Sequence, residues 1–305
     1  MTGIDATADV RSGFVALVGR PNAGKSTLVN ALVGSKVAIV SNKPQTTRQR
    51  LRAIVDTEDA QIVLVDTPGL HRPHDVLGEE LNRSALMSLA DVDVACMVLD
   101  SSQPAGGGDR WVAAHVAASP AKKVLVLTKA DINDRVPMEK RLSEAAALAP
   151  FDDVVVLSAK EGFNLEGFLS VVTAMLPIGP RYFPRDMSTD QSDEVLVAEL
   201  IREKVLWYTR DEVPHSVGVG IDDMAYDKKK DVSVIHATIY VEHESQQGIL
   251  VGHGGEMIKK IGTEARRDLE MMLGNRVFLD LAVRVKRDWR RDAAQIRRFG
   301  YGEGQ

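Results

Sequence analysis

Residues 14–33 read FVALVGRPNAGKSTLVNALV and join a short apolar, β-branched run to a helical pattern through a turn that contains two glycines. The turn matches G-x-x-x-x-G-K-[ST], with Gly19 and Gly24 as its glycines and Lys25 and Ser26 as its last two positions. Between a strand and a helix, this motif predicts a P-loop, in which backbone N–H groups and the helix N-terminus bind phosphate groups. The stretch therefore predicts an α/β domain that begins with a phosphate site.

The chain up to about residue 180 continues the same alternation of apolar runs and longer helical patterns. The further runs are QIVLVD at 61–66, VACMVLD at 94–100, KVLVLTK at 123–129 and VVVLSA at 154–159. Strands that alternate with helices form βαβ units, so we expect a mostly parallel sheet with helices on both faces. Ligands of such sheets bind outside the carboxyl ends of the strands. The turns after these runs should therefore contain the functional residues.

Length and composition predict more than one domain and exclude some classes of protein. A chain of 305 residues exceeds one ordinary core, so we expect two domains. The net charge of -5 argues against a uniformly basic nucleic-acid binder, although seven Lys or Arg against two Asp at 284–298 favour a polyanion contact near that end. We expect the single cysteine, Cys96, to be a buried hydrophobe. The start of the chain lacks a secretory pattern and no run reaches the ~18 apolar residues of a spanning helix, which predicts a cytoplasmic protein.

The second half of the chain begins after a segment rich in proline and turn formers, PIGPRYFPRDMSTDQSD at 177–193. We place a first domain at 1–180, a linker at 181–193 and a second domain at 194–305. The predicted elements of the second domain follow the order α-β-β-α-α-β, with a helix at 195–208, strands at 216–224 and 232–242, a helical pair, and a strand at 276–285. This pattern indicates an α+β domain.

The predicted phosphate site comprises the whole turn and the residue after it: Gly19, Arg20, Pro21, Asn22, Ala23, Gly24, Lys25, Ser26 and Thr27. Lys25 would bridge the β and γ oxygens of a nucleoside triphosphate, and the Ser26 hydroxyl would ligate Mg²⁺. Lys25 is therefore also a candidate catalytic residue.

Two further segments complete the predicted triphosphate site. One strand ends in the sequence Asp66, Thr67, Pro68 and Gly69, where the carboxylate can hold Mg²⁺ through water and the glycine N–H can face the γ-phosphate. Alone, this sequence would indicate only a tight turn. The loop PQTTR at 44–48 offers a threonine hydroxyl to the metal, and we expect Thr47 rather than Thr46 to supply it, against the alternative of a solvated threonine pair. The predicted Mg²⁺ ligands are Ser26, Thr47 and Asp66, and the predicted catalytic groups are Lys25, Thr47 and Gly69.

The turns after two later strands predict a base site. They contribute Thr128, Lys129 and Asp131 from one turn and Ser158, Ala159 and Lys160 from the other. Asp131 would accept hydrogen bonds from the guanine N1–H and exocyclic amine, which adenine cannot supply, and this favours GTP over ATP. GTPases usually have Asn-Lys-x-Asp, so Thr128 in place of Asn leaves a base contact and a loop-bracing contact open. A surface turn with paired charges is the alternative for Lys129 and Asp131.

Taken together, GRPNAGKSTL, PQTTR and DTPGL resemble the corresponding motifs of the Era-type GTPases. The resemblance implies hydrolysis of GTP to GDP and phosphate with Mg²⁺. It also implies slow hydrolysis, because Leu70 after DTPG cannot orient water as a glutamine does. Asn22 would bind an activating K⁺ ion, or alternatively only brace the loop.

In the second half, Gly252, His253, Gly254 and Gly255 form a GxxG sequence between an apolar run and a basic helix. In the α-β-β-α-α-β order this resembles a type II KH domain, which clamps about four nucleotides of a single strand. We expect RNA contacts from these four residues and from Lys259, Lys260 and Arg266. A KH loop usually has Lys or Arg at its centre, so His253 and Gly254 weaken the expected phosphate contact. A solvated amphipathic helix is the alternative for the basic residues.

A G domain, a linker and a C-terminal KH domain form the layout of the Era family. That resemblance implies binding of GTP and GDP, binding of the 3′ end of 16S rRNA, and a role in assembly and maturation of the 30S subunit. It also implies contact with the inner face of the cell membrane, and we expect a monomer. One alternative is an RNA-binding assembly factor whose nucleotide is structural, and another is a related GTPase that acts on tRNA or the large subunit. Trp289 either stacks on bases or caps the second domain.

Overall fold

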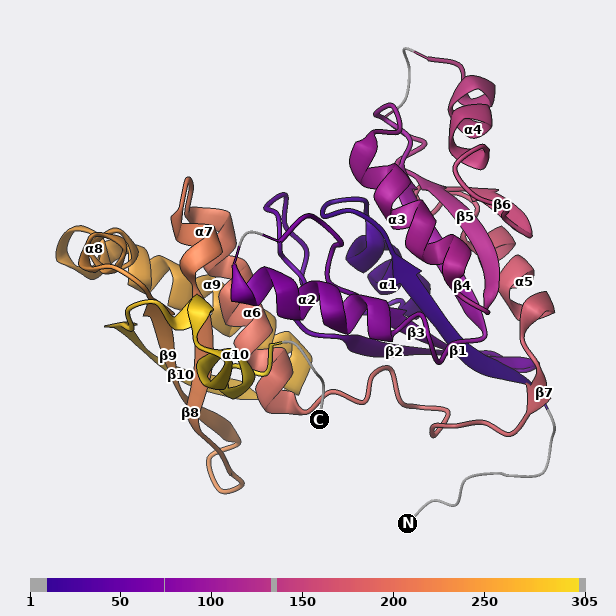
Figure 1. Cartoon of the computed structure of the whole chain (residues 1–305). Coiled ribbons are helices and arrows are strands. Elements are labelled where there is room, and N and C mark those ends of the chain that lie inside the picture. Colours follow the sequence, from indigo (N-terminus) through magenta and orange to yellow (C-terminus); the bar gives the residue numbers. More distant parts are fainter. Residues whose placement is uncertain (1–9, 74, 133–135, 302–305) are drawn as a thin grey trace.

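The computed structural model describes residues 10–73, 75–132 and 136–301. Two separate β-sheets, each with its own helices, make up the two halves of the chain, and a long connecting segment joins them (Figure 1). The predicted fold class, a P-loop α/β domain followed by an α+β domain, is confirmed.

The first sheet has the strand order β2-β3-β1-β4-β5-β6, and β7 pairs with the beginning of β1. The strands are β1 (Val10–Val18), β2 (Leu51–Asp56), β3 (Ala60–Asp66), β4 (Val94–Asp100), β5 (Lys122–Thr128), β6 (Asp153–Val156) and β7 (Ile178–Gly179). The five predicted runs form β1, β3, β4, β5 and β6, which are parallel to their neighbours in that group. The sequence did not predict β2, which is antiparallel to β3 and lies at the edge of the sheet.

Helices cover both faces of this sheet. Helices α1 (Lys25–Val33) and α5 (Leu165–Met175) pack on one face, and α2 (Val76–Met87), α3 (Gly107–Ala118) and α4 (Met138–Ala146) pack on the other. Cys96 lies in the buried core under α1 and α5, and burial raises the pKa of its thiol, as expected for a small buried hydrophobe. Both faces are covered, and the carboxyl ends of the parallel strands remain available for a ligand.

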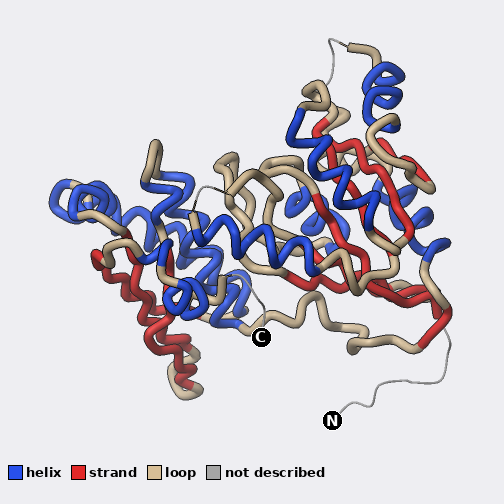
Figure 2. Tube along the Cα trace, in the orientation of Figure 1, coloured by secondary structure: helices blue, strands red, loops and turns tan. Residues whose placement is uncertain are grey.

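Residues 180–192 contain no helix or strand longer than an isolated bridge, but they follow the first domain closely (Figure 2). The backbone N–H of Ile54 donates to the Ser188 carbonyl over 2.9 Å, and the Gln61 side-chain oxygen accepts from the N–H groups of Tyr182 and Phe183 at 2.7 and 2.9 Å. The segment is therefore anchored along the β2–β3 edge and does not act as a free tether.

The second sheet has the order β10-β9-β8, in which β9 is parallel to β10 and antiparallel to β8. Its elements are α6 (Asp193–Tyr208), α7 (Val213–Ser216), β8 (Gly218–Asp227), β9 (Val232–Val241), α8 (Glu244–Val251), a 3₁₀ turn (His253–Gly255), α9 (Glu256–Leu273) and β10 (Arg276–Val285). Helices α6, α8 and α9 pack on one face around a continuous apolar core. Apart from the short α7, this is the predicted order of helices and strands.

The C-terminal segment folds back onto the first domain. It contains the 3₁₀ turn η2 (Trp289–Arg291) and the helix α10 (Ala293–Arg298), which the sequence did not predict. Its apolar side chains form one buried cluster with two leucines of α2: Leu77, Leu81, Trp289, Ile296, Phe299 and Tyr301. The basic segment therefore has an apolar side that joins the two domains.

Candidate functional site

A cavity of about 1010 Å³ lies at the carboxyl ends of the parallel strands. The P-loop residues Arg20 to Thr27, part of the loop between α1 and β2, Gly69 and Lys129 line it. Its wall also includes His215 and Arg290 of the second domain. The cavity therefore lies at the predicted phosphate site, and it extends to the interface between the domains.

The P-loop backbone turns sharply just before α1. Gly24, the N-cap of α1, has a φ of 97°, which disfavours any residue with a side chain. Lys25 is buried, and its ammonium group donates to the carbonyls of Gly19 at 3.2 Å and Arg20 at 3.1 Å. Burial lowers the pKa of Lys25 to about 8, and the nearby Asp66 carboxylate opposes this shift. A bound phosphate would supply the anionic partner that this buried cation needs.

The three predicted metal ligands meet at the start of α1. The Ser26 hydroxyl donates to Asp66 Oδ2 over 2.6 Å and lies 2.8 Å from the Thr47 hydroxyl. Asp66 is fully buried, and burial raises the pKa of its carboxyl. Its other oxygen, Oδ1, has no hydrogen-bond partner within the described residues. Two hydroxyls and a carboxylate with a free buried oxygen fit a hard cation such as Mg²⁺, which takes oxygen ligands and retains several waters.

The turn after β3 packs directly on the P-loop. A Cβ at Gly69 would lie 2.6 Å from both the Cα and the N of Pro21, so only glycine fits here. The N–H of Leu70 donates to the Gly19 carbonyl over 3.0 Å, and the Leu70 side chain is buried. The Leu70 side chain therefore points away from the cavity, and it has no polar atom with which to orient water.

At the base end, Thr128 connects β5 to the P-loop. Its hydroxyl donates to the Ala23 carbonyl at 2.6 Å and lies 3.2 Å from the Leu99 carbonyl. The loop-bracing contact that the missing asparagine left open is therefore made by the threonine. Asp131 accepts a hydrogen bond from the Ser158 hydroxyl over 2.6 Å, so the two predicted base-site turns are in contact.

In the second domain, the GxxG residues form the turn between α8 and α9. Gly252, Gly254 and Gly255 all have positive φ values, of 72°, 57° and 83°. A Cβ at Gly252 would lie 2.8 Å from the Met257 Cβ, whereas Gly254 and Gly255 face open space. Beside this turn, α9 and β10 enclose a groove of about 360 Å³ lined by Ile258, Lys259, Gly262, Thr263, Arg266, Val277, Phe278, Leu279 and Leu281. Apolar side chains with two flanking cations suit bases and phosphates of a single strand.

Comparison with known proteins identifies both halves of the chain. A family model described as a 50S ribosome-binding GTPase matches residues 14–129, and a KH domain model matches residues 212–290. GTPase Era of Mycolicibacterium smegmatis is 44% identical over 298 residues, which cover 96% of this chain and 99% of that protein. GTPase Era of Mycobacterium tuberculosis is 45% identical over 299 residues, with the same coverage. This chain belongs to the Era family of GTPases.

Two solved structures are similar to this Era-family chain over 96% of its length, each with 36% identity and a TM-score of 0.92. One is a point variant of Aquifex aeolicus Era bound to GDP·AlF4⁻, and the other is Era in complex with MgGDPNP and nucleotides 1506–1542 of 16S ribosomal RNA. This chain covers 100% of each of those chains. It is thus a GTPase that hydrolyses GTP, with a G domain followed by a KH domain, as the sequence predicted.

Two acidic residues of the nucleotide cavity, Asp100 and Asp109, were not predicted from the sequence. Asp109 of α3 pairs with the predicted Arg20 at 3.1 Å, and Asp100 at the end of β4 pairs with the predicted Lys129 at 2.7 Å. Asp100 is the last residue of a predicted strand, and its place at the carboxyl end could have indicated that it lies at the ligand site. The Asn22 amide donates to the Asn42 carbonyl at 2.8 Å, which is the bracing role considered for it, and a K⁺ ion at Asn22 stays a prediction.

The predicted RNA-binding residues of this Era-family chain do not all lie at the groove. Lys259 and Arg266 line it, but the Lys260 amine lies 4.2 Å from the centre of the Tyr208 ring of α6. Trp289 is buried and its indole N–H donates to the Ser216 carbonyl at 2.8 Å, so in this conformation it caps the domain and does not face RNA. Arg290 is paired with Glu242 at 2.7 Å and with Asp75 of the first domain at 3.2 Å.

No helix within residues 10–73, 75–132 and 136–301 combines the length and the hydropathy that crossing a membrane requires.

Proposed function

We propose that this GTPase binds the 3′ end of 16S rRNA through its GxxG turn and the groove between α9 and β10, and assists the assembly and maturation of the 30S ribosomal subunit. One observation supports this most directly: a triphosphate site and a groove suited to single-stranded RNA occur in one chain with close contacts between the domains. The similar Era structure that contains MgGDPNP and nucleotides 1506–1542 of 16S ribosomal RNA supports the same assignment.

Within the nucleotide site, we assign phosphate binding to residues 19–27, with Lys25 on the β and γ oxygens. Ser26, Thr47 and Asp66 would hold Mg²⁺, which supplies positive charge to the phosphate oxygens when it is bound. The Gly69 N–H would face the γ-phosphate. Guanine would be bound by Asp131 and by residues 128–129 and 158–160.

We assign RNA contacts to residues 252–255, Lys259 and Arg266, with Lys260 available only if its amine leaves the Tyr208 ring. The corresponding domain limits are 1–180 for the G domain, 181–193 for the linker and 194–305 for the KH domain. An activating K⁺ ion would be bound by the side-chain oxygen of Asn22, because the hydrogen bond to the Asn42 carbonyl uses only the amide nitrogen, and a dependence of kcat on K⁺ over Na⁺ would reveal it.

The triphosphate state would be coupled to RNA binding through Thr47 and Asp66. A loop that ligates the metal only in the presence of the γ-phosphate relaxes after hydrolysis. The GTP-bound form would then present the KH surface to rRNA, and hydrolysis would release the particle.

The test is binding of a single-stranded RNA with the sequence of nucleotides 1506–1542, measured at fixed salt with GDPNP and with GDP. We expect tighter binding with GDPNP, and loss of binding to an RNA of scrambled sequence. Equal binding in the two nucleotide states would contradict the coupling. No preference for the native sequence would contradict the rRNA assignment and favour the related GTPases that act on other RNAs.

A further inference from the structure

The loop between α1 and β2, residues 34–50, has no helix or strand, yet the second domain contacts it along its length. The Glu203 carboxylate of α6 accepts the N–H of Val40 at 2.9 Å, and the indole N–H of Trp207 donates to the Val40 carbonyl at 3.1 Å. Near the other end, the Gln49 amide donates to the Phe299 carbonyl at 3.2 Å. A loop of this length is normally mobile, so these contacts determine its conformation.

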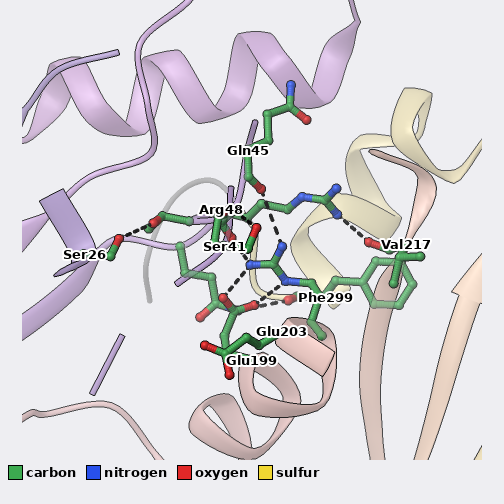
Figure 3. A network of polar contacts seen from close by, with 12 residues as sticks. Ser26, Ser41, Gln45, Arg48, Glu199, Glu203, Val217 and Phe299 are labelled. Atoms are coloured by element: carbon green, nitrogen blue, oxygen red, sulfur yellow. Dashed lines mark hydrogen bonds and ion pairs between the residues drawn. The ribbon is translucent and has the colours of Figure 1, made fainter. Parts of the chain in front are cut away.

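Another set of contacts involves Arg202 of α6, whose side chain is fully buried. Two parallel hydrogen bonds from its guanidinium to Glu199, at 2.8 and 2.6 Å, fix the plane of the group. Two further N–H groups point at the loop and donate to the carbonyls of Thr46 and Gln45. Figure 3 shows Glu199 beside this network and Gln45 above it. Arg202 therefore holds the peptide group that precedes Thr47.

A second arginine fixes the chain on the other side of Thr47. Arg48 is 1% exposed, and its guanidinium reaches into the second domain (Figure 3). There it donates to three carbonyls at the end of α7: those of Pro214, His215 and Val217. The last carbonyls of a helix have no partner within the helix, so they are ready acceptors for a cation.

One aromatic ring near the C-terminus lies close to both guanidinium groups. The centre of the Tyr301 ring is 5.3 Å from Cζ of Arg48 and 5.9 Å from Cζ of Arg202. These distances fall within the range of cation–π attraction, which is strongest where the cation is desolvated. The C-terminal segment thus stabilises two like charges that would otherwise repel each other.

We propose that Arg202 and Arg48 are positioning residues for Thr47, so that the second domain sets the place of the threonine hydroxyl at the metal site. Their contacts fix the chain on both sides of Thr47, whose hydroxyl lies 2.8 Å from the Ser26 hydroxyl. A ligand must be held within a fraction of an ångström to contribute fully, and the positioning shell supplies that precision. The inference rests on the proposed role of Thr47 as a ligand of Mg²⁺ in the triphosphate state.

The test compares the affinities for fluorescent GDPNP and fluorescent GDP in the full-length chain at several Mg²⁺ concentrations. Arg202→Lys retains the charge but loses the planar fork. Glu199→Gln leaves the arginine but weakens its anchor. Arg210→Lys is the matched control, because Arg210 is an exposed arginine just beyond the end of α6. A thermal unfolding curve for each variant measures its fold separately.

We expect Arg202→Lys and Glu199→Gln to lower the GDPNP affinity about tenfold relative to the GDP affinity, and to raise the Mg²⁺ concentration needed for GDPNP binding. A purely structural role would lower both affinities together. Since Arg202 acts through Thr47, Arg202→Lys should have no further effect on the ratio when combined with Thr47→Ala. The inference is overturned if Arg202→Lys leaves the ratio of GDPNP to GDP affinity unchanged. It is also overturned if Arg202→Lys changes that ratio by the same factor in the Thr47→Ala background as in the unaltered chain.

The single substitution Thr47→Ala tests the metal role of Thr47 separately from the positioning role of Arg202. If that substitution leaves the ratio of affinities unchanged, the proposed metal role of Thr47 is wrong and the positioning role falls with it. If Thr47→Ala lowers the ratio and Arg202→Lys behaves like Arg210→Lys, the metal role stands and only the positioning role is refuted.

Discussion

Removal of the Thr128 hydroxyl tests whether the contact between the base site and the P-loop supports nucleotide binding. The hydroxyl donates to the Ala23 carbonyl at 2.6 Å, and Thr128 is 2% exposed. Thr128→Ala would leave a buried acceptor without this donor, at a cost of about 1–3 kcal/mol. This cost divides between the free energy of unfolding and the free energy of nucleotide binding. In the nucleotide-free protein the P-loop can relax, and it must regain its geometry when the nucleotide binds. If all of it falls on binding, the Kd for GDP rises roughly 5- to 150-fold.

Two other substitutions of Thr128 separate the effect of the hydroxyl donor from the effect of side-chain size. Thr128→Ser retains the donor and should bind GDP like the unaltered chain. Thr128→Val puts a methyl group where the hydroxyl lies 2.6 Å from the Ala23 carbonyl, and a carbon needs ~3.3–3.6 Å, so the P-loop must move. We expect Val to weaken GDP binding more than Ala. Fluorescent-GDP titration and thermal unfolding measure the two parts of the cost, and unchanged values for both Ala and Val would refute the reasoning.

Three further outcomes are expected. Asp131→Asn should weaken GDP binding by at least about 100-fold, because the two charge-assisted hydrogen bonds to guanine contribute about 1.5–3 kcal/mol each. The same substitution should improve binding of xanthosine diphosphate, because the asparagine amide can donate to the additional carbonyl of xanthine. Competition titrations measure both effects. Lys259→Ala should reduce the slope of the logarithm of RNA affinity against the logarithm of salt concentration by about one. The same substitution at Lys229, an exposed residue in the β8–β9 turn, should leave that slope unchanged. Hydrogen exchange in residues 36–50 should be faster with GDP than with GDPNP, while residues 76–87 of α2 stay protected in both states; equal exchange of the loop in the two states would contradict this.

The sequence was sufficient wherever one local pattern determined the structure. The long apolar runs became the parallel strands because their side chains pack into the apolar cores on the two faces of the sheet. Strand β2 was missed because LRAIVD is short and interrupted by Arg52, and an edge strand needs less apolar surface. Helix α10 has six residues, too few to be stable alone, and it forms because Ile296 packs against α2.

The unpredicted parts of the site depend on partners far apart in the chain. The Thr128 hydroxyl bonds to Ala23, 105 positions away, so no local pattern could settle its role. Arg202 and Glu203 look like the charged face of a solvated helix, but both are buried against the loop that follows α1. Trp289 within a basic segment suggested base stacking as readily as packing, and only the fold places it in the core.

The loop at residues 34–50 and helix α2 are held to the second domain by contacts of different kinds, and this difference predicts which of the two responds to hydrolysis. The loop before β2 is held mainly by hydrogen bonds around Arg48 and Arg202, and burial together with the neighbouring arginine lowers the pKa of Arg48 to about 10. Buried cations gain little net stability, because their bonds exchange for bonds to water. Helix α2 is held by apolar packing of Leu77 and Leu81, which water cannot replace. We therefore expect loss of the γ-phosphate to act first on the loop that contains Thr47, while α2 remains docked.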